Sequence, residues 1–167
     1  MTQDPFEILL PAGIRFSVEE IFHNLEIQIH RLASNSGMRK RGISVAMELF
    51  QNLQNHRNPN HLGLLRIRSL PDGNLQITTL NLVSGPGSEK LATKFHILEK
   101  SADLRQTFQN KLAAKAREPE VGVGDFGLEF CFLKSKSRKL QALAYPGENQ
   151  FIVFVSFTVS NSGVTQY

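Results

Sequence analysis

Two side chains that suit phosphate chemistry lie four residues apart in the segment 47–56. Glu48 offers a carboxylate and Asn52 a carboxamide, and residues at this spacing share one face of a helix. A carboxylate can accept the proton of a hydroxyl nucleophile, and the oxygen atoms of both groups suit a hard cation such as Mg2+. A later glycine-bearing segment, 122–128, could close over phosphate groups. The pattern predicts a nucleotide site.

The pair is carried by a predicted helix over about 43–54. Apolar residues recur there with the period of a helix, and Glu48 and Asn52 lie beside that stripe. The polar, basic stretch 34–42 before it is interpreted as a loop. His56 follows Asn52 by one turn, and we interpret it as a helix-end histidine that compensates the helix dipole, outside the catalytic set.

The segments at the start of the chain predict a strand followed by a helix. Residues 6–16 are mostly apolar but contain Pro11 and Gly13, which favours an edge strand or two short strands broken by a turn. Ser17 suits the start of a helix that extends to about Ala33. Its apolar stripe consists of Phe22, Leu25, Ile29 and Leu32.

Two antiparallel hairpins are predicted farther along the chain. The first joins strands 62–70 and 75–83 through a polar turn, and the second joins strands 139–145 and 150–160. The last strand is apolar on both faces for part of its length, which is typical of a strand inside a sheet.

The region between the hairpins predicts helices and a glycine loop. Residues 84–87 are interpreted as a loop, and two helices joined near Ser101 follow, up to about residue 115. A glycine loop at 118–126 then leads into a short helix at 127–136.

This order of elements predicts the fold class. Two hairpins leave one sheet face to be covered by amphipathic helices, so we expect an α+β two-layer sandwich, with a mainly antiparallel sheet and helices on one face. No internal repeat or change of composition marks a second domain, and a single domain over 1–167 is expected.

The composition limits the classes of function. The chain has 167 residues, 41% of them hydrophobic and 20% charged, which is typical of a soluble globular domain. A net charge of +4 and a pI near 9.4 favour anionic partners such as a nucleotide or an acidic protein surface. The basic residues are mostly spread out, and no Trp and two Tyr offer little stacking surface, so no nucleic-acid partner is expected. The oligomeric state stays open.

The single cysteine and the lack of long apolar stretches predict a cytoplasmic protein. Cys131 cannot form an internal disulfide, and its apolar neighbours indicate a buried, reduced thiol rather than a nucleophile. The N-terminal residues lack the pattern of an export signal, and no window approaches the ~18 apolar residues that a membrane span needs. We expect no membrane anchoring.

With these elements laid out, the chain resembles the histidine-kinase-like (GHKL) ATPase superfamily, which has the Bergerat ATP-binding fold. Within it, the chain is most similar to the small SiaB-type protein kinases. The resemblance covers most of the chain and depends on the motif E-L-x-Q-N at 48–52, the hairpin that reaches Asn81, the glycine loop and the Phe-rich last strand. It implies ATP and Mg2+ as cofactors.

The resemblance also implies roles for single residues. Asn52 would ligate the Mg2+ that bridges the phosphates, and Glu48 would act as the general base or orient the attacking hydroxyl. Asn81 would accept a hydrogen bond from the adenine amino group. The second glycine box, where backbone amides approach phosphate oxygens, would consist of Gly122, Gly124 and Gly127.

Two functions follow from these patterns. The first is an ATP-binding regulatory protein kinase of the anti-sigma type, which phosphorylates Ser or Thr on a small anti-sigma-antagonist-like protein; this partner is implied by the resemblance alone. The alternative is a non-catalytic interaction module that keeps the fold, because the first glycine box is missing at 81–87 and the second is one residue longer than the family pattern.

Overall fold

The computed structural model describes residues 4–58, 60–117, 126–145 and 149–162. These residues form one five-stranded sheet and five helices. In chain order the elements are β1 (Phe6–Leu10), α1 (Val18–Leu32), α2 (Ser36–His56), β2 (Gly63–Ser69), β3 (Leu75–Ser84), α3 (Gly85–Lys100), α4 (Leu104–Arg117), α5 (Gly127–Lys134), β4 (Ser137–Tyr145) and β5 (Gln150–Val159). The predicted α+β two-layer sandwich is confirmed.

The sheet is antiparallel throughout, with the strand order β1-β2-β3-β5-β4. Both predicted hairpins are present, as β2 with β3 and β4 with β5. β5 pairs with β3 along its whole length, from Gln150 opposite Ser84 to Val159 opposite Leu75. The last strand therefore lies inside the sheet, as its apolar residues on both faces predicted.

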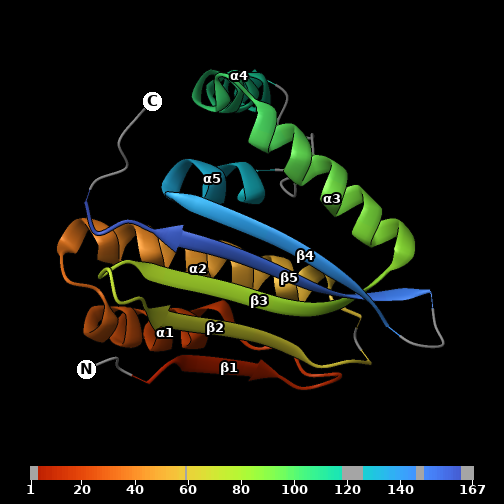
Figure 1. Ribbon diagram of the computed structural model, residues 1–167, viewed down its shortest axis with the longest axis horizontal. Helices are drawn as coiled ribbons and strands as arrows, with labels where there is room; N and C mark the ends of the chain where they lie inside the picture. Colours follow the sequence, from red (N-terminus) through yellow and green to blue (C-terminus); the bar gives the residue numbers. More distant parts are fainter. Residues whose placement is uncertain (1–3, 59, 118–125, 146–148, 163–167) are drawn as a thin grey trace.

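Helices α1 and α2 cover one face of the sheet, and Figure 1 shows both behind the strands, with α3, α4 and α5 toward the β4 edge. The core forms where the inward residues of β2, β3 and β5 meet the apolar stripes of α1 and α2. Phe50, Ile77 and Phe157 are among its fully buried side chains. Burial of such a side chain contributes about 1.5–3 kcal/mol, so this stripe fixes which face of α2 is left for polar residues.

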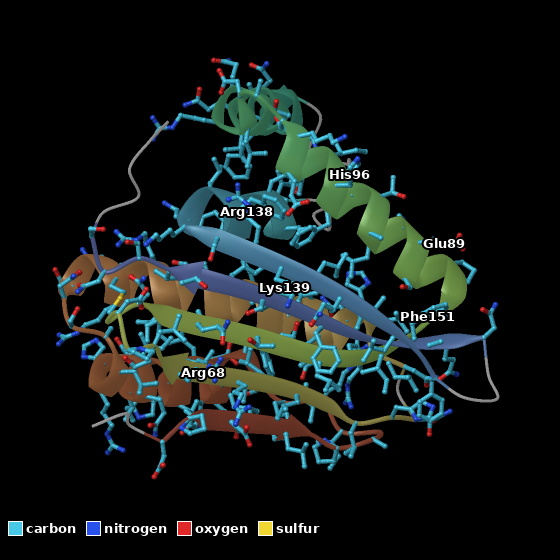
Figure 2. All side chains as sticks on the ribbon, viewed as in Figure 1. Arg68, Glu89, His96, Arg138, Lys139 and Phe151 are labelled. Atoms are coloured by element: carbon cyan, nitrogen blue, oxygen red, sulfur yellow. The ribbon has the colours of Figure 1, made fainter. Side chains whose placement is uncertain are left out.

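A second part of the core attaches α3 and α5 to the sheet. The rings of Phe95 on α3 and Phe132 on α5 meet edge to face, with centroids 4.8 Å apart. The Phe132 ring in turn lies 5.6 Å from that of Phe157 on β5. Arg138 on β4 donates a hydrogen bond of 3.2 Å to the carbonyl of Phe132 and stacks over its ring, and Figure 2 shows it next to α5. These contacts fix α5 relative to the sheet.

The start of α2 differs from the prediction. The helix begins at Ser36, so most of the stretch interpreted as a loop at 34–42 is helical. Asn35 caps it, because its side chain accepts a hydrogen bond of 2.8 Å from the amide of Met38. Met38 and Gly42 are buried against the core. Arg39 and Arg41 of this turn are half-buried, and Arg41 donates a hydrogen bond of 2.8 Å to the carbonyl of Ser160. The run of basic residues in the sequence concealed the two buried positions beside it.

The start of α3 also differs. Residues 84–87, interpreted as a loop, form the N-cap and first turn of α3. The Ser84 hydroxyl accepts a hydrogen bond of 3.3 Å from the amide of Gly87. Pro86 is accommodated because the first turn of a helix needs no amide donor there. A Ser-Gly-Pro-Gly sequence is compatible with a loop and with a capped helix start. The helix start forms here, because the buried residues farther along α3, such as Phe95 and Leu98, pack the helix against the core.

The first strand is shorter than 6–16, since β1 ends at Leu10 and Gly13 adopts a turn conformation with φ +73°. Arg57, which caps the end of α2, is buried and donates hydrogen bonds to the carbonyls of Leu10, Pro11, Ile14 and His61. The end of α2 is thereby fixed to the loop after β1. Among the described helices, none is long and apolar enough to cross a membrane.

Candidate functional site

A cavity of about 310 Å3 lies between α2, the strands β3 and β5, and the helices α3 and α5. This volume is at the lower end of the range of small-molecule sites. Seven apolar side chains line it: Leu49, Leu53, Val83, Leu91, Leu128, Val153 and Val155. Such a lining can receive a flat apolar group such as a nucleobase, provided that a few polar groups fix its orientation.

The polar residues of the lining come from three elements. α2 supplies Asn52 and His56, β3 supplies Thr79, Asn81 and its last residue Ser84, and α3 supplies Lys90 and Lys94. Among the described residues that line the cavity, two are lysines and none is an acid. The cavity therefore favours an anionic or neutral ligand over a cationic one.

Three of the sequence-predicted site residues meet where α2 contacts α5. Glu48 and Asn52 lie on successive turns of α2, and Gly127 is the first residue of α5. A Cβ on Gly127 would collide with Oε2 of Glu48 and lie 3.2 Å from Nδ2 of Asn52. The backbone of α5 thus approaches both side chains as closely as a glycine permits.

The environment of Glu48 suits proton transfer. The side chain is half-buried, and burial raises the pKa of its carboxyl above the usual value for glutamate. A base works best when its pKa approaches the working pH, so this shift favours a role as proton acceptor. The neighbouring Cys131 is fully buried, as predicted, and burial followed by the Glu48 charge raises the pKa of its thiol. A thiol with a raised pKa is a poor nucleophile.

Asn81 supplies an unused hydrogen-bond acceptor. Its Oδ1 is buried and has no hydrogen-bond partner among the residues that the structure describes, although the residue lines the cavity. A buried acceptor without a partner costs free energy, which a ligand with an amino or amide hydrogen would recover. The atom fits the adenine contact that the sequence resemblance implied.

Other predicted features lie elsewhere or outside the description. Gly122 and Gly124 fall outside the described residues. His56, left out of the catalytic set, is the last residue of α2 and lines the cavity with an exposed side chain.

Within the described ranges, no cluster of three or more His, Cys, Asp or Glu side chains could hold a metal. Mg2+ commonly takes one or two protein oxygens together with substrate phosphates, and the adjacent Glu48 and Asn52 fit that pattern.

The sequence reasoning missed the charged residues on the other side of the cavity. Lys90 and Lys94 lie one turn apart on α3 and line the cavity. Glu89 and His96 on the same helix are outside the lining and exposed, and Figure 2 labels both. Glu129 on α5 is 1% exposed and pairs with two lysines. One sequence pattern could have indicated this ion pair. Glu129 is the only charged residue in the otherwise apolar stretch 127–133, and an acid that is buried there needs cationic partners.

Comparisons with known proteins support the fold. A scan against protein-family models finds no match for this sequence, and a search of curated proteins finds none either. A search of solved structures finds a chain from the crystal structure of the SiaB–SiaC complex from Pseudomonas aeruginosa, with a TM-score of 0.72 and 17% sequence identity. The match covers 91% of this chain and 89% of that one. The protein therefore has a SiaB-like fold.

Proposed function

We propose that the protein is an ATP-binding regulatory kinase that phosphorylates a Ser or Thr hydroxyl on a small partner protein. The observation that carries the proposal is the meeting of Glu48, Asn52 and Gly127 beside an apolar cavity whose only charged lining residues, among those described, are lysines. A carboxylate, an amide oxygen that can bind a metal ion and a close backbone approach are groups that phosphoryl-transfer sites use.

In this proposal, the chain's own residues bind and orient the reactants. The aliphatic side chains of the cavity receive the adenine, and Asn81 Oδ1 accepts a hydrogen bond from its amino group. Asn52 would hold Mg2+, which would neutralise phosphate charge. The partner hydroxyl oxygen attacks the γ-phosphorus while the bond to the oxygen between the β- and γ-phosphorus breaks, ADP leaves, and Glu48 accepts the hydroxyl proton.

The comparison structure adds support for a protein partner. That crystal structure is of a complex of SiaB with SiaC, so a chain of this fold assembles with a second protein there. We extend this to a small anti-sigma-antagonist-like partner for the present chain.

Titration calorimetry with ATP and Mg2+ tests the proposal. The unmodified protein is expected to bind ATP more tightly with Mg2+ than without it. Asn52→Ala should abolish this metal-dependent gain, whereas Asn55→Ala, on an exposed part of the same helix, should keep it. A protein that shows neither binding heat nor thermal stabilisation at millimolar ATP would contradict the proposal.

One observation favours a second function, a non-catalytic interaction module. Residues 84–87, within the segment 81–87 where the first glycine box is missing, form the cap and first turn of α3. If the titration shows no nucleotide binding while the chain still forms a complex with a protein partner, this second function replaces the first.

A further inference from the structure

One face of the sheet is left open by the described helices. Successive side chains of a strand alternate between the two faces, and the core residues Ile77 on β3 and Phe157 on β5 mark the face that α1 and α2 cover. Their neighbours Thr78 and Ser156 therefore point to the opposite face, where their hydroxyl oxygens lie 2.9 Å apart. We call this the open face, and Figure 1 shows it in front of α1 and α2.

One half of the open face is apolar. A row of four apolar side chains crosses β1, β2, β3 and β5 in register: Leu9, Leu64, Leu80 and Phe154. The next row pairs Ile152 on β5 with Leu143 on β4. All six side chains are half-buried or exposed, and Leu9 and Leu143 are 54% and 56% exposed. The solvated face of an antiparallel sheet is normally polar, so a continuous apolar patch on it indicates an interaction surface.

The other half of the open face is polar and has opposite charges at its two edges. The row next to the apolar one crosses all five strands with Glu7, Arg66, Thr78, Ser156 and Lys139. Glu7 on the edge strand β1 pairs with Arg66 on β2 at 2.9 Å. Lys139, labelled in Figure 2, lies on the other edge strand, β4. The acid and the lysine therefore lie at equal strand separations on either side of β3.

This arrangement of charges is complementary to itself, because β3 is the middle strand of the sheet. When two open faces pack about a two-fold axis parallel to β3, β1 of one copy faces β4 of the other, and β2 faces β5. Glu7 then faces Lys139 of the second copy. Arg66 faces Ser156 of the second copy, so the positive charges of this row do not face one another.

The apolar row and the size of the open face fit the same arrangement. Leu80 faces its own counterpart on the axis, and Leu64 faces Phe154 of the second copy. Two sheets with aligned strands pack about 10 Å apart with interdigitated side chains. From the usual spacing and rise of strands, the open face covers about 650 Å2, which approaches the roughly 800 Å2 that each partner buries in a standard interface.

We propose that the open face is the contact between two copies of this chain, which pack sheet against sheet as a two-fold dimer. The apolar half excludes water, and the contact of Glu7 with Lys139, which the symmetry creates twice, fixes the alignment of the copies. This inference goes beyond the proposed function and does not depend on it. The cavity lies on the helix-covered face, where Thr79 and Val155 line it, so nucleotide binding and dimer formation are measured separately.

Sedimentation equilibrium tests the proposal. The unmodified chain is expected to have twice its mass of 18.7 kDa at micromolar concentration. Leu80→Glu should raise the dimer Kd at least a hundredfold, because it buries two carboxylates at the axis. Leu9→Glu should raise it at least tenfold and tests the same face at an exposed position, where the fold tolerates a charge. Ile97→Glu, on α3 and 62% exposed, is the matched control and should leave the Kd unchanged.

Three results of this measurement would overturn the proposal. The first is an unmodified chain that stays monomeric at the highest concentration reached, which would leave the open face to a different protein. The second is a dimer that Leu80→Glu and Leu9→Glu leave intact. The third is a dimer that Ile97→Glu weakens as much as they do.

Exchange of charges tests which residues face each other. Glu7→Lys and Lys139→Glu, both at exposed positions, each place like charges across the interface and should weaken the dimer by about tenfold. The double variant restores opposite charges and should recover most of the affinity. The loss of the contact between Glu7 and Arg66 occurs in the double variant as well, so it cannot explain a recovery. Losses that add in the double variant would refute the two-fold arrangement.

Discussion

Gly127, the first residue of α5, lies against the carboxylate of Glu48, so closely that any side chain at this position would contact it. The two residues are far apart in the sequence and come from different helices. Their contact determines where the Glu48 carboxylate lies, and it motivates the first prediction.

Gly127→Ala is expected to displace the Glu48 carboxylate rather than to unfold the protein. The colliding atom is the end of a flexible side chain, and alanine favours helix by up to about 1 kcal/mol over glycine, so stability should change by less than about 1 kcal/mol. Mg2+-dependent ATP binding should weaken at the same time, because Asn52 Nδ2 is also contacted. Chemical denaturation and calorimetry measure the two effects. A variant with full metal-dependent ATP affinity would contradict the role of this contact.

The raised pKa of Glu48 predicts a pH dependence of stability. Because the folded state binds this proton more tightly than the unfolded state, Glu48 stabilises the fold most below its ordinary pKa, and the contribution is lost as the pH rises through the higher folded pKa. Glu48→Gln removes the charge, so its stability relative to the unmodified protein should rise over that interval. Urea denaturation at a series of pH values measures the difference. A difference that does not change with pH would refute the prediction.

Asn81→Leu is expected to separate stability from binding. The substitution removes a buried acceptor that has no partner among the described residues, so the ligand-free protein should keep its stability or gain up to about 1 kcal/mol. Adenosine affinity should fall because the contact to the amino group is lost. Thermal unfolding measures the stability and calorimetry measures the adenosine affinity. Asn55→Leu, on the exposed side of α2, is the matched control. Unchanged adenosine affinity would exclude Asn81 from the site.

The described side chains of α4 are exposed or half-buried, so this helix should be the least protected of the five. It is held by the edge-to-face contact of Phe108 with Phe126, at 6.0 Å between centroids, and by the Lys111–Glu129 pair. Phe108→Ala should accelerate amide hydrogen exchange in α4 while leaving α2 protected, because few apolar contacts oppose local opening. Equal acceleration in α2 would show that α4 unfolds only with the whole domain.

Local patterns were sufficient to predict most of the fold. The hairpin turn at Gly73, with φ +76°, and the two apolar faces of β5 were visible as sequence patterns, and so was the shared helix face of Glu48 and Asn52. The first turns of α2 and α3 were missed because Asn35 and Ser84 act as caps, and residues rich in Gly, Pro and charge suit both loops and capped helix starts.

The site was predictable only in part, for a physical reason. The spacing of Glu48 and Asn52 is a property of one helix, whereas the Glu129 pairs join residues from three helices. Nothing in the local sequence of α3 distinguishes Lys94 from Lys90 or Lys100. The packing of α5 against α3 brings Glu129 next to Lys94, and that packing includes ring contacts such as Phe95 with Phe132.

The central claim is that the metal and phosphates of a nucleotide lie beside Glu48 and Asn52, and paramagnetic NMR tests it most directly. With Mn2+ in place of Mg2+, added ATP should broaden the side-chain amide signals of Asn52 far more than those of Asn161, which lies at the end of β5 among Ser34, Asn35 and Asn74. Uniform broadening, or broadening centred away from Asn52 while ATP is bound, would contradict the account.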